Sequence, residues 1–400
     1  MTFSHGIEKM HSIFKKGAST QPVVIFDIGS ASIGAAVVYF DTEVPRISYS
    51  ARQALPFLGE ADKKKLIPQI EEILSFATAN IQKNGLTPQK GLSVIPREIV
   101  CIFSPLWSET QTTEASFTHK EKFIVSDTVM DNLLAQIHEN NKETKDDTEV
   151  VIEEVVISSL LNNYPTQAPL GKETLSINVS FLESSIDKNL DTKVRDVIYK
   201  TFNVDTPLLL RSFTLAAFSV ARDIHENMKD FLLIDVTGEI TDIAVVRSSV
   251  LKDTLSFPYG KNSIIRNVAS RKGSIPEDVL ARIKISLSSE DPEVKIDIKE
   301  EEKKWIDFFG KACEELSSDS MPLPREVFLI TDTHYERLFR SMIEHVEFGQ
   351  FTALKDPFLV KSFLKSKTKG MFLLDEGVLS DDFITIGALF YSREYLSRKS

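Results

Sequence analysis

The chain has 400 residues, of which 42% are hydrophobic and 26% are charged. These are the proportions of a soluble globular protein, and the length predicts two domains. The net charge of −11 argues against nucleic acid as a partner. Two cysteines cannot form a disulfide framework, and the chain has neither a signal-peptide pattern nor an apolar run long enough to span a bilayer. We therefore expect a cytoplasmic protein.

The first predicted segment, residues 1–21, is a short amphipathic helix followed by a linker. Phe3, Ile7, Met10 and Phe14 fall on one helical face, and three lysines lie elsewhere. Such a segment could contact a membrane peripherally or bind a partner. The alternative is a helix that packs on its own domain, or a frayed tail.

The first lobe is expected over residues 22–91. The segments VVIFDIG, IGAAVVYF and PRISYSARQAL predict three strands that form a meander and open an α/β domain. The segment LIPQIEEILSFATANIQK repeats apolar residues at helical spacing, which predicts an amphipathic helix.

A strand–helix–strand–strand block is expected over residues 92–186, inserted into the first lobe. Residues 99–103 form a buried-strand candidate, and Ser126 and Asp127 are suitable caps for the helix that follows. The segments VVIEEVVISSLL and LSINVSFLES predict two further strands around a turn.

The rest of the chain predicts a helix of the first lobe at 187–205 and the second lobe at 206–400. Alternating strands and helices there indicate α/β layers. A helical subdomain is expected at about 261–325, where Trp305 and Phe309 belong to an apolar stripe that packs onto the domain. The last helix, DDFITIGALFYSREYL, is expected to return to the first lobe.

Two similar segments carry the predicted chemistry, VVIFDIGSASIGAAVV near the start and FLLIDVTGEITDIAVV beyond the midpoint. Each is an apolar strand that ends in an aspartate, Asp27 or Asp235, followed by a tight turn and a second apolar strand. Such a hairpin can wrap backbone N–H groups around phosphates and hold a carboxylate near their magnesium. Two copies facing each other, with a third strand–turn–helix at REVFLITDTHYERLF, would grip one nucleotide from two sides.

The order of these segments resembles that of the actin-like ATPase superfamily, and within it the FtsA/PilM-like proteins of bacterial cell division and type IV pilus assembly. The segments NNYPTQAPLGKETLSINVSFL, LLRSFTLAAFSVA, LSFPYGKNSIIRNVA and DDFITIGALF are similar to segments of that family. The resemblance implies an α/β protein with the actin-like ATPase fold. It would have two ribonuclease H-like lobes and an FtsA-type inserted subdomain in the first.

The resemblance also implies the cofactors ATP and Mg²⁺. Asp27 and Asp235 would approach Mg²⁺ through water, because this ion keeps much of its hydration shell. Lys284 would lie beside the adenosine, and Lys261 could act as a point charge on phosphate. The implied nucleotide-binding residues are Asp27, Gly29, Ser30, Asp235, Gly238, Thr241, Asp242, Gly260, Lys261, Lys284 and Thr331.

The second hairpin departs from the family pattern DxGGGTTD, since it is DVTGEITD. Thr237 and Glu239 replace glycines, which let a backbone approach phosphates closely, and Ile240 replaces a threonine. Glu239 would also put a negative charge near an anionic ligand. We therefore expect weak or vestigial ATP binding and at most slow hydrolysis, with no catalytic residue assigned.

The predicted function is that of an FtsA/PilM-like cytoskeletal adaptor at the inner face of the membrane. It would dock a tubulin-like division protein or a pilus inner-membrane protein, and it could self-assemble. The alternatives are an active ATPase or sugar-kinase-like phosphotransferase of the same fold, and a pseudo-ATPase scaffold without a ligand.

Sedimentation with liposomes tests the N-terminal segment. If residues 1–17 anchor the protein, their deletion abolishes co-sedimentation with anionic liposomes, because the apolar face and its flanking lysines are lost together. Unchanged sedimentation of the truncated protein would end the anchor hypothesis.

Overall fold

The computed structural model describes residues 19–59, 62–87, 94–141, 147–166, 168–289, 296–318, 321–364, 368 and 370–397. The predicted membrane or partner contacts, Phe3, Ile7, Met10 and Phe14, lie outside the described residues. Among the described helices, none combines the length and the hydropathy that a bilayer crossing needs.

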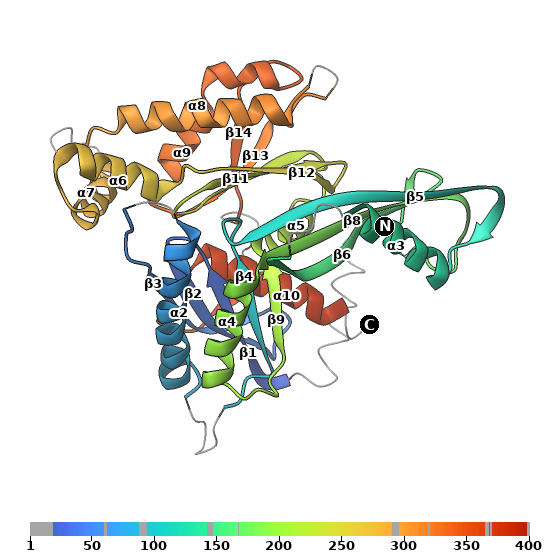
Figure 1. The fold of residues 1–400 in the computed structure, drawn as a ribbon, viewed down its shortest axis with the longest axis horizontal. Coiled ribbons are helices and arrows are strands. Elements are labelled where there is room, and N and C mark those ends of the chain that lie inside the picture. Colours follow the sequence, from blue (N-terminus) through green and yellow to red (C-terminus); the bar gives the residue numbers. More distant parts are fainter. Residues whose placement is uncertain are drawn as a thin grey trace.

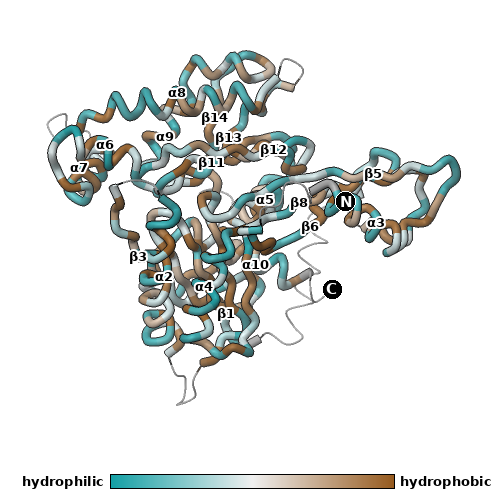
Figure 2. Tube along the Cα trace, in the orientation of Figure 1, coloured by the Kyte–Doolittle hydropathy of each residue, from teal (hydrophilic) through white to brown (hydrophobic). Residues whose placement is uncertain are grey.

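The first lobe is built on a six-stranded sheet (Figure 1). Its order is β15 (Leu373–Leu374), β3 (Arg46–Ala54), β2 (Ser32–Phe40), β1 (Ser19–Ile28), β4 (Glu98–Phe103) and β9 (Leu208–Ser212). The central strand β1 pairs antiparallel with β2 and parallel with β4. The predicted meander is confirmed, and Figure 2 shows the hydrophobic colour along β1 inside this lobe.

The second lobe repeats this arrangement in a five-stranded sheet. Its order is β12 (Val250–Phe257), β11 (Thr241–Arg247), β10 (Phe231–Val236), β13 (Glu326–Thr331) and β14 (Leu359–Ser362). The central strand β10 again pairs antiparallel with the next strand and parallel with the strand on its other side. Asp27 and Asp235 therefore occupy equivalent ends of the two central strands.

A third sheet of four antiparallel strands extends from the side of the molecule (Figure 1). Its order is β5 (Ser108–Ile124), β8 (Glu173–Asp187), β6 (Glu149–Leu161) and β7 (Tyr164–Pro165). Helix α3 (Asp127–Asn141) covers one face with a small apolar cluster that includes Leu133, Ile137 and Phe181. The 17-residue strand β5 is not among the predicted elements.

The topology corrects two predicted boundaries. Strand β4 lies within the block predicted at 92–186, and β9 lies within the second lobe predicted at 206–400, yet both belong to the sheet of the first lobe. Strand β4 pairs with β1 in parallel, and β9 pairs with β4 in parallel. Parallel partners are far apart in the chain, so local sequence patterns do not reveal them.

Helices cover both faces of each large sheet. They are α2 (Lys63–Asn80) with its π-helical continuation η1 (Ile81–Gly85), α4 (Lys188–Thr201), α5 (Phe213–Ile224), α6 (Lys261–Lys272), α7 (Pro276–Ser288), α8 (Lys299–Leu316), α9 (Glu336–Ile343), the 3₁₀ turn η3 (Val346–Phe351) and α10 (Asp382–Ser397). Helices α2 and α4 pack on the outer face of the first sheet, and α6 to α9 pack on the outer face of the second. As predicted, Trp305 and Phe309 of α8 are buried in the second lobe.

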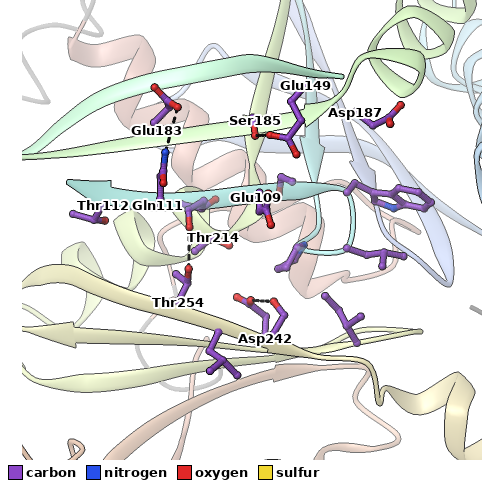
Figure 3. Close-up of a pocket in the computed structure, with 18 of the residues that line it drawn as sticks. Glu109, Gln111, Thr112, Glu149, Glu183, Ser185, Asp187, Thr214, Asp242 and Thr254 are labelled. Carbon is purple, nitrogen blue, oxygen red and sulfur yellow. Dashed lines mark hydrogen bonds between the residues drawn. The ribbon is translucent and has the colours of Figure 1, made fainter. Parts of the chain in front are cut away.

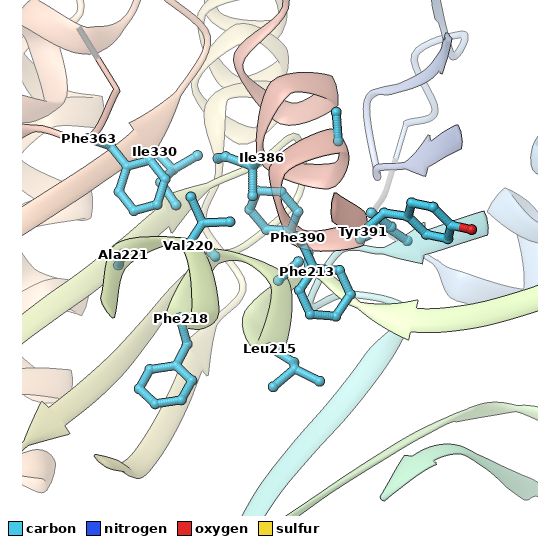
Figure 4. Packing of buried hydrophobic residues seen from close by; sticks show 14 of the residues in the cluster. Phe213, Leu215, Phe218, Val220, Ala221, Ile330, Phe363, Ile386, Phe390 and Tyr391 are labelled. Atoms are coloured by element: carbon cyan, nitrogen blue, oxygen red, sulfur yellow. The ribbon is translucent and has the colours of Figure 1, made fainter. Parts of the chain in front are cut away.

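Helices α5 and α10 form the layer between the two large sheets. Phe213 and Phe218 of α5 and Ile386 and Phe390 of α10 belong to one buried cluster with side chains from β1, β4, β10 and β13 (Figure 4). Because both sheets bury a face against the same helices, this core joins the lobes.

Glu153 of β6 connects the third sheet to this layer. It is 6% exposed and accepts hydrogen bonds from the backbone N–H of Ser212, at 3.1 Å, and from the Ser212 hydroxyl. The same hydroxyl caps α5 by accepting from the N–H of Leu215 at 3.2 Å. Burial raises the pKa of Glu153 to about 7, although the hydrogen bonds and Arg211 oppose this shift.

This raised pKa predicts a dependence of stability on pH. Between the ordinary value of 4.5 and about 7, the native protein holds a proton that the unfolded chain releases. Stability therefore falls as the pH rises through this window, by an amount on the order of 3 kcal/mol. The substitution Glu153→Gln removes most of this fall, which urea unfolding at pH 5, 6, 7 and 8 measures.

Glu154→Gln is the matched control, because it changes the neighbouring residue of β6 and leaves Glu153 in place. We expect it to keep the parental pH dependence. Equal slopes for the parent and Glu153→Gln would show that Glu153 does not titrate in this range.

Candidate functional site

A cavity of about 400 Å³ lies between the lobes, at the ends of the two central strands. It brings together six of the eleven residues predicted to bind nucleotide: Asp27, Gly29, Ser30, Gly238, Lys261 and Thr331. Its wall also includes Arg52 and Asp381, which the sequence patterns did not single out. The predicted convergence of both hairpins on one cleft is thus present in the structure.

The other five predicted residues do not line this cavity. Asp235 is buried beside it, close enough for the charge of Asp27 to affect its pKa. Thr241 is buried at the start of β11, where its hydroxyl donates to the carbonyl oxygen of Tyr259, and Asp242 lines a different cleft. Lys284 on α7 is near enough to affect the pKa of Lys261.

The fifth, Gly260, has a packing role. The turn of the second hairpin caps α6, since the N–H groups of Lys261 and Asn262 donate to the carbonyl oxygens of Thr237 and Gly238 at 3.1 and 2.7 Å. A Cβ at Gly260 would lie 2.5 Å from the Gly238 oxygen. Only glycine allows this approach.

The turns of the two hairpins touch each other directly. The Ser30 hydroxyl donates to Thr237 Oγ1 at 3.2 Å and accepts from the backbone N–H of Glu239 at 3.1 Å. A Cβ at Gly238 would lie only 2.6 Å from the Cβ of Ala31. The turns are thus in contact at these residues, and one N–H that could bind a phosphate group, that of Glu239, already donates to Ser30.

The Glu239 carboxylate does not face the cavity. It is 3% exposed and accepts two hydrogen bonds from Arg266 of α6 at 2.8 and 2.6 Å, and a third from Asn262 at 2.9 Å. The expectation that it places a negative charge beside an anionic ligand is therefore wrong. Arg266 neutralises this charge, and it belongs to α6, the helix that the second hairpin caps.

Arg52 neutralises Asp27 on the opposite wall. One guanidinium nitrogen donates to Asp27 Oδ2 at 2.7 Å, and two contact the carboxylate of Asp381 at 2.6 and 2.9 Å. Burial raises the pKa of Asp27, and Arg52 opposes this shift. Burial also acts on Asp381, but there Arg52 prevails and the pKa lies below its ordinary value.

Asp235 has no such partner. Both of its carboxylate oxygens are buried and make no hydrogen bond within the described residues. Burial, followed by the charges of Asp242 and Asp27, raises its pKa well above the ordinary value. Burial therefore favours the neutral, protonated form of the Asp235 carboxyl group over its ionised form.

These groups do not fit magnesium and a nucleoside triphosphate in this arrangement. Magnesium prefers ionised oxygen ligands, but Asp27 is already paired with Arg52, and burial without a hydrogen-bond partner disfavours the ionised form of Asp235. The hairpin turns are in contact at Ser30, Thr237 and Gly238. No step of phosphoryl transfer follows from this geometry.

A larger cleft of about 800 Å³ lies between the third sheet and the second lobe (Figure 3). Strands β5 and β8 form one wall, and the β11–β12 hairpin forms the other. The wall carries two lysines, Lys63 and Lys252, and a surplus of acidic residues: Glu109, Glu149, Glu183, Asp187, Asp242 and Asp253. These residues come from distant segments, which explains why sequence spacing did not reveal the cleft.

Edge strands border this cleft on both sides. Strand β5 ends the order of the third sheet, and β12 ends the order of the second large sheet. The two walls meet where the Thr254 hydroxyl donates to the carbonyl oxygen of Thr110 at 2.9 Å and where Lys252 pairs with Glu114. An extended peptide segment can add to an edge of this kind.

A group of possible metal ligands lies on the third sheet. His138 of α3, Glu154 of β6 and Glu183 of β8 each offer one atom within 4.8 Å of the others, although no metal-ligand spacing of histidines is evident in the sequence. His138 and Glu154 lie near the surface, where such groups commonly occur without a metal.

Neither the protein-family models nor the curated proteins give a match to this chain. Solved structures do. The PilM–PilN type IV pilus biogenesis complex aligns with a TM-score of 0.60 at 11% identity, over 92% of this chain and 96% of that chain. A Bacteroides thetaiotaomicron protein with an actin-like ATPase fold aligns with a TM-score of 0.41 at 10% identity, over 94% and 98%.

The ethanolamine utilization protein EutJ from Carboxydothermus hydrogenoformans aligns with a TM-score of 0.43 at 12% identity, over 92% of this chain and 97% of that chain. Of these three, only the PilM alignment is close enough to support an argument, and identity this low establishes the fold alone. It extends over both lobes, whose sheets repeat one strand order with an aspartate at the end of each central strand. The chain therefore has the actin-like ATPase fold, as PilM does.

Proposed function

We propose that the protein is an actin-fold adaptor of the FtsA/PilM kind, which docks a protein partner at the inner face of the membrane. The observation that carries this proposal is the acidic cleft of about 800 Å³ between the third sheet and the second lobe. In this proposal the third sheet corresponds to the FtsA-type inserted subdomain. The work of the protein is recognition, with peripheral membrane contact through the N-terminal segment.

The charge of the cleft indicates the chemistry of the partner segment. Six acidic residues against two lysines attract a segment rich in lysine or arginine, and partly desolvated walls strengthen that attraction. The edge strands β5 and β12 favour an extended conformation of the bound segment. A pilus inner-membrane protein is the first candidate, because the similar PilM structure is a complex with PilN. A tubulin-like division protein is the second, and self-assembly would use another surface.

ATP binding is, in this proposal, weak or lost. The eleven predicted nucleotide-binding residues keep their predicted role only if the hairpin turns separate, because Ser30 and Glu239 now bind each other. The alternative of an ATPase or sugar-kinase-like phosphotransferase requires that opening, together with an ionised carboxylate at Asp235. The ion pair of Asp27 with Arg52 and the upward shift in the pKa of the buried Asp235 favour the adaptor.

Charge reversal in the cleft tests partner docking. The double substitution Glu109→Lys/Asp253→Lys changes two exposed residues of facing walls. We expect it to weaken partner binding at least tenfold, about 1.4 kcal/mol, because a basic segment then meets like charge. Co-purification from the native host identifies the partner, and fluorescence anisotropy with its labelled segment measures the dissociation constant.

The control is Glu226→Lys/Glu376→Lys, an equal charge change at exposed residues outside the cleft. It should bind like the parent, and parental binding should weaken as salt is raised. Equal binding by both double variants would reject the cleft as the docking site. Capture of no division or pilus protein would reject the adaptor.

Phosphate release tests the alternative function. We expect turnover of Mg·ATP far below the rate of about 1–100 per second that is typical of kinases, with and without candidate sugars. A rate within that range would favour the phosphotransferase and reject the adaptor.

A further inference from the structure

We propose that Arg52 is a built-in substitute for the divalent cation beside Asp27, so that the two lobes close on each other without a bound nucleotide. This inference deepens the proposed loss of nucleotide function and rests on it. It does not depend on the proposed partner or on the acidic cleft.

The route of the Arg52 side chain is set by a row of three residues across neighbouring strands. Asp27 of β1 is paired with Gly34 of β2, and Gly34 is paired with Arg52 of β3. Paired residues on neighbouring strands point to the same face of a sheet. The missing side chain at Gly34 opens the path, since a Cβ there would lie 2.5 Å from an Arg52 guanidinium nitrogen.

The guanidinium is held on all its edges. Besides Asp27 at 2.7 Å and Asp381 at 2.6 and 2.9 Å, it donates to the Ser32 hydroxyl at 3.0 Å. Its central carbon lies 5.1 Å from the centre of the Phe383 ring. A planar guanidinium with fixed donors suits two carboxylates better than a mobile ammonium would.

The place between the Asp27 and Asp381 carboxylates requires a positive charge. Asp27 and Asp381 converge there, and the charge of each carboxylate opposes ionisation of the other. Asp27 is 4% exposed at its side chain, so water screens this repulsion poorly. A hydrated divalent ion or Arg52 can neutralise the pair, and here the Arg52 guanidinium occupies the space between the two carboxylates.

The second lobe shows what happens without such a residue. The equivalent row there is Asp235, Asp242 and Ser256, with no cation. Asp235 is left without a hydrogen-bond partner, and its pKa is raised well above the ordinary value. The pairing of Asp27 thus comes from Gly34 and Arg52 and is not a general property of the fold.

Contact between the turns of the two hairpins completes the closed arrangement of the lobes. With Asp27 and Glu239 neutralised by arginines of their own lobes, the turns meet through Ser30 and Thr237 with no anion between them. The cavity that remains contains no cation free of a carboxylate partner within the described residues, because Lys261 pairs with Asp332 at 3.1 Å.

Magnesium rescue of an Arg52 variant tests the substitution of arginine for metal. In Arg52→Met the apolar stem remains and the charge is lost, so we expect the thermal midpoint to fall by about 5 °C or more. Addition of 10 mM MgCl₂ should restore at least half of this loss. The same salt should change the midpoint of the parent by less than about 1 °C.

Arg46→Met is the matched control. Arg46 lies on the same strand and also pairs with two carboxylates, Asp41 at 2.8 Å and Asp375 at 2.7 Å, but these side chains are more exposed, at 31% and 38%, than Asp27 and Asp381, at 4% and 13%. We expect no recovery with MgCl₂ beyond that produced by NaCl at equal ionic strength. Failure of MgCl₂ to raise the midpoint of Arg52→Met, or an equal rise in Arg46→Met, would overturn the proposal.

The parent protein provides a second test that does not depend on the folding of a variant. Calorimetry and thermal unfolding with 1 mM Mg·ATP should show neither heat of binding nor a shift of the midpoint. Magnesium-dependent binding in the micromolar range would overturn the proposal. Partner capture is measured separately, so the adaptor function and the role of Arg52 can fail independently.

Discussion

The apolar layer formed by α5 and α10 between the two large sheets is the interaction on which the rest of the structure depends. Both sheets bury one face against it, so their central strands must face each other. Side chains alternate along a strand, and Asp27 continues the same face as Ile25, while Asp235 continues the same face as Leu233. Packing of apolar side chains therefore brings two carboxyl groups together at the rim of a core, where ionisation is unfavourable.

The two lobes relieve this electrostatic conflict in different ways. The first lobe neutralises Asp27 with Arg52, whose side chain passes over Gly34. The second lobe leaves the Asp235 carboxyl without a hydrogen-bond partner within the described residues, and burial shifts its pKa upward. One duplicated topology thus carries an ion pair in the first lobe and an unpaired, buried carboxyl group in the second, so the shared strand order of the hairpins does not fix their electrostatics.

The distribution of charge divides the molecule into a closed inner cavity and an open outer cleft. Inside, Asp27 and Asp332 are paired with arginine and lysine, and the hairpin turns touch. Outside, the cleft between the third sheet and the second lobe is lined by more acidic than basic residues, although Glu183 and Asp242 among them are buried. Unbalanced charge at a surface supports recognition of a partner, whereas balanced charge inside supports rigidity.

The sequence determined the elements whose signal is local. Apolar runs ending in Asp27 and Asp235 predicted the two hairpins, and helical spacing predicted α2, α8 and α10. Strand β5 escaped because its residues are mostly polar and exposed, and it is held by a long antiparallel pairing with β8. Local periodicity does not report such a partner.

Only the tertiary structure decided the state of the site. The sequence places Arg52 twenty-five positions from Asp27 and Arg266 twenty-seven positions from Glu239, with nothing to mark either pair. Strand register brings the first pair together, and the hairpin that caps α6 brings the second together. Charge neutralisation acts through distances of a few ångströms in space, so the chain's pattern predicted where the carboxyl groups lie but not which groups neutralise them.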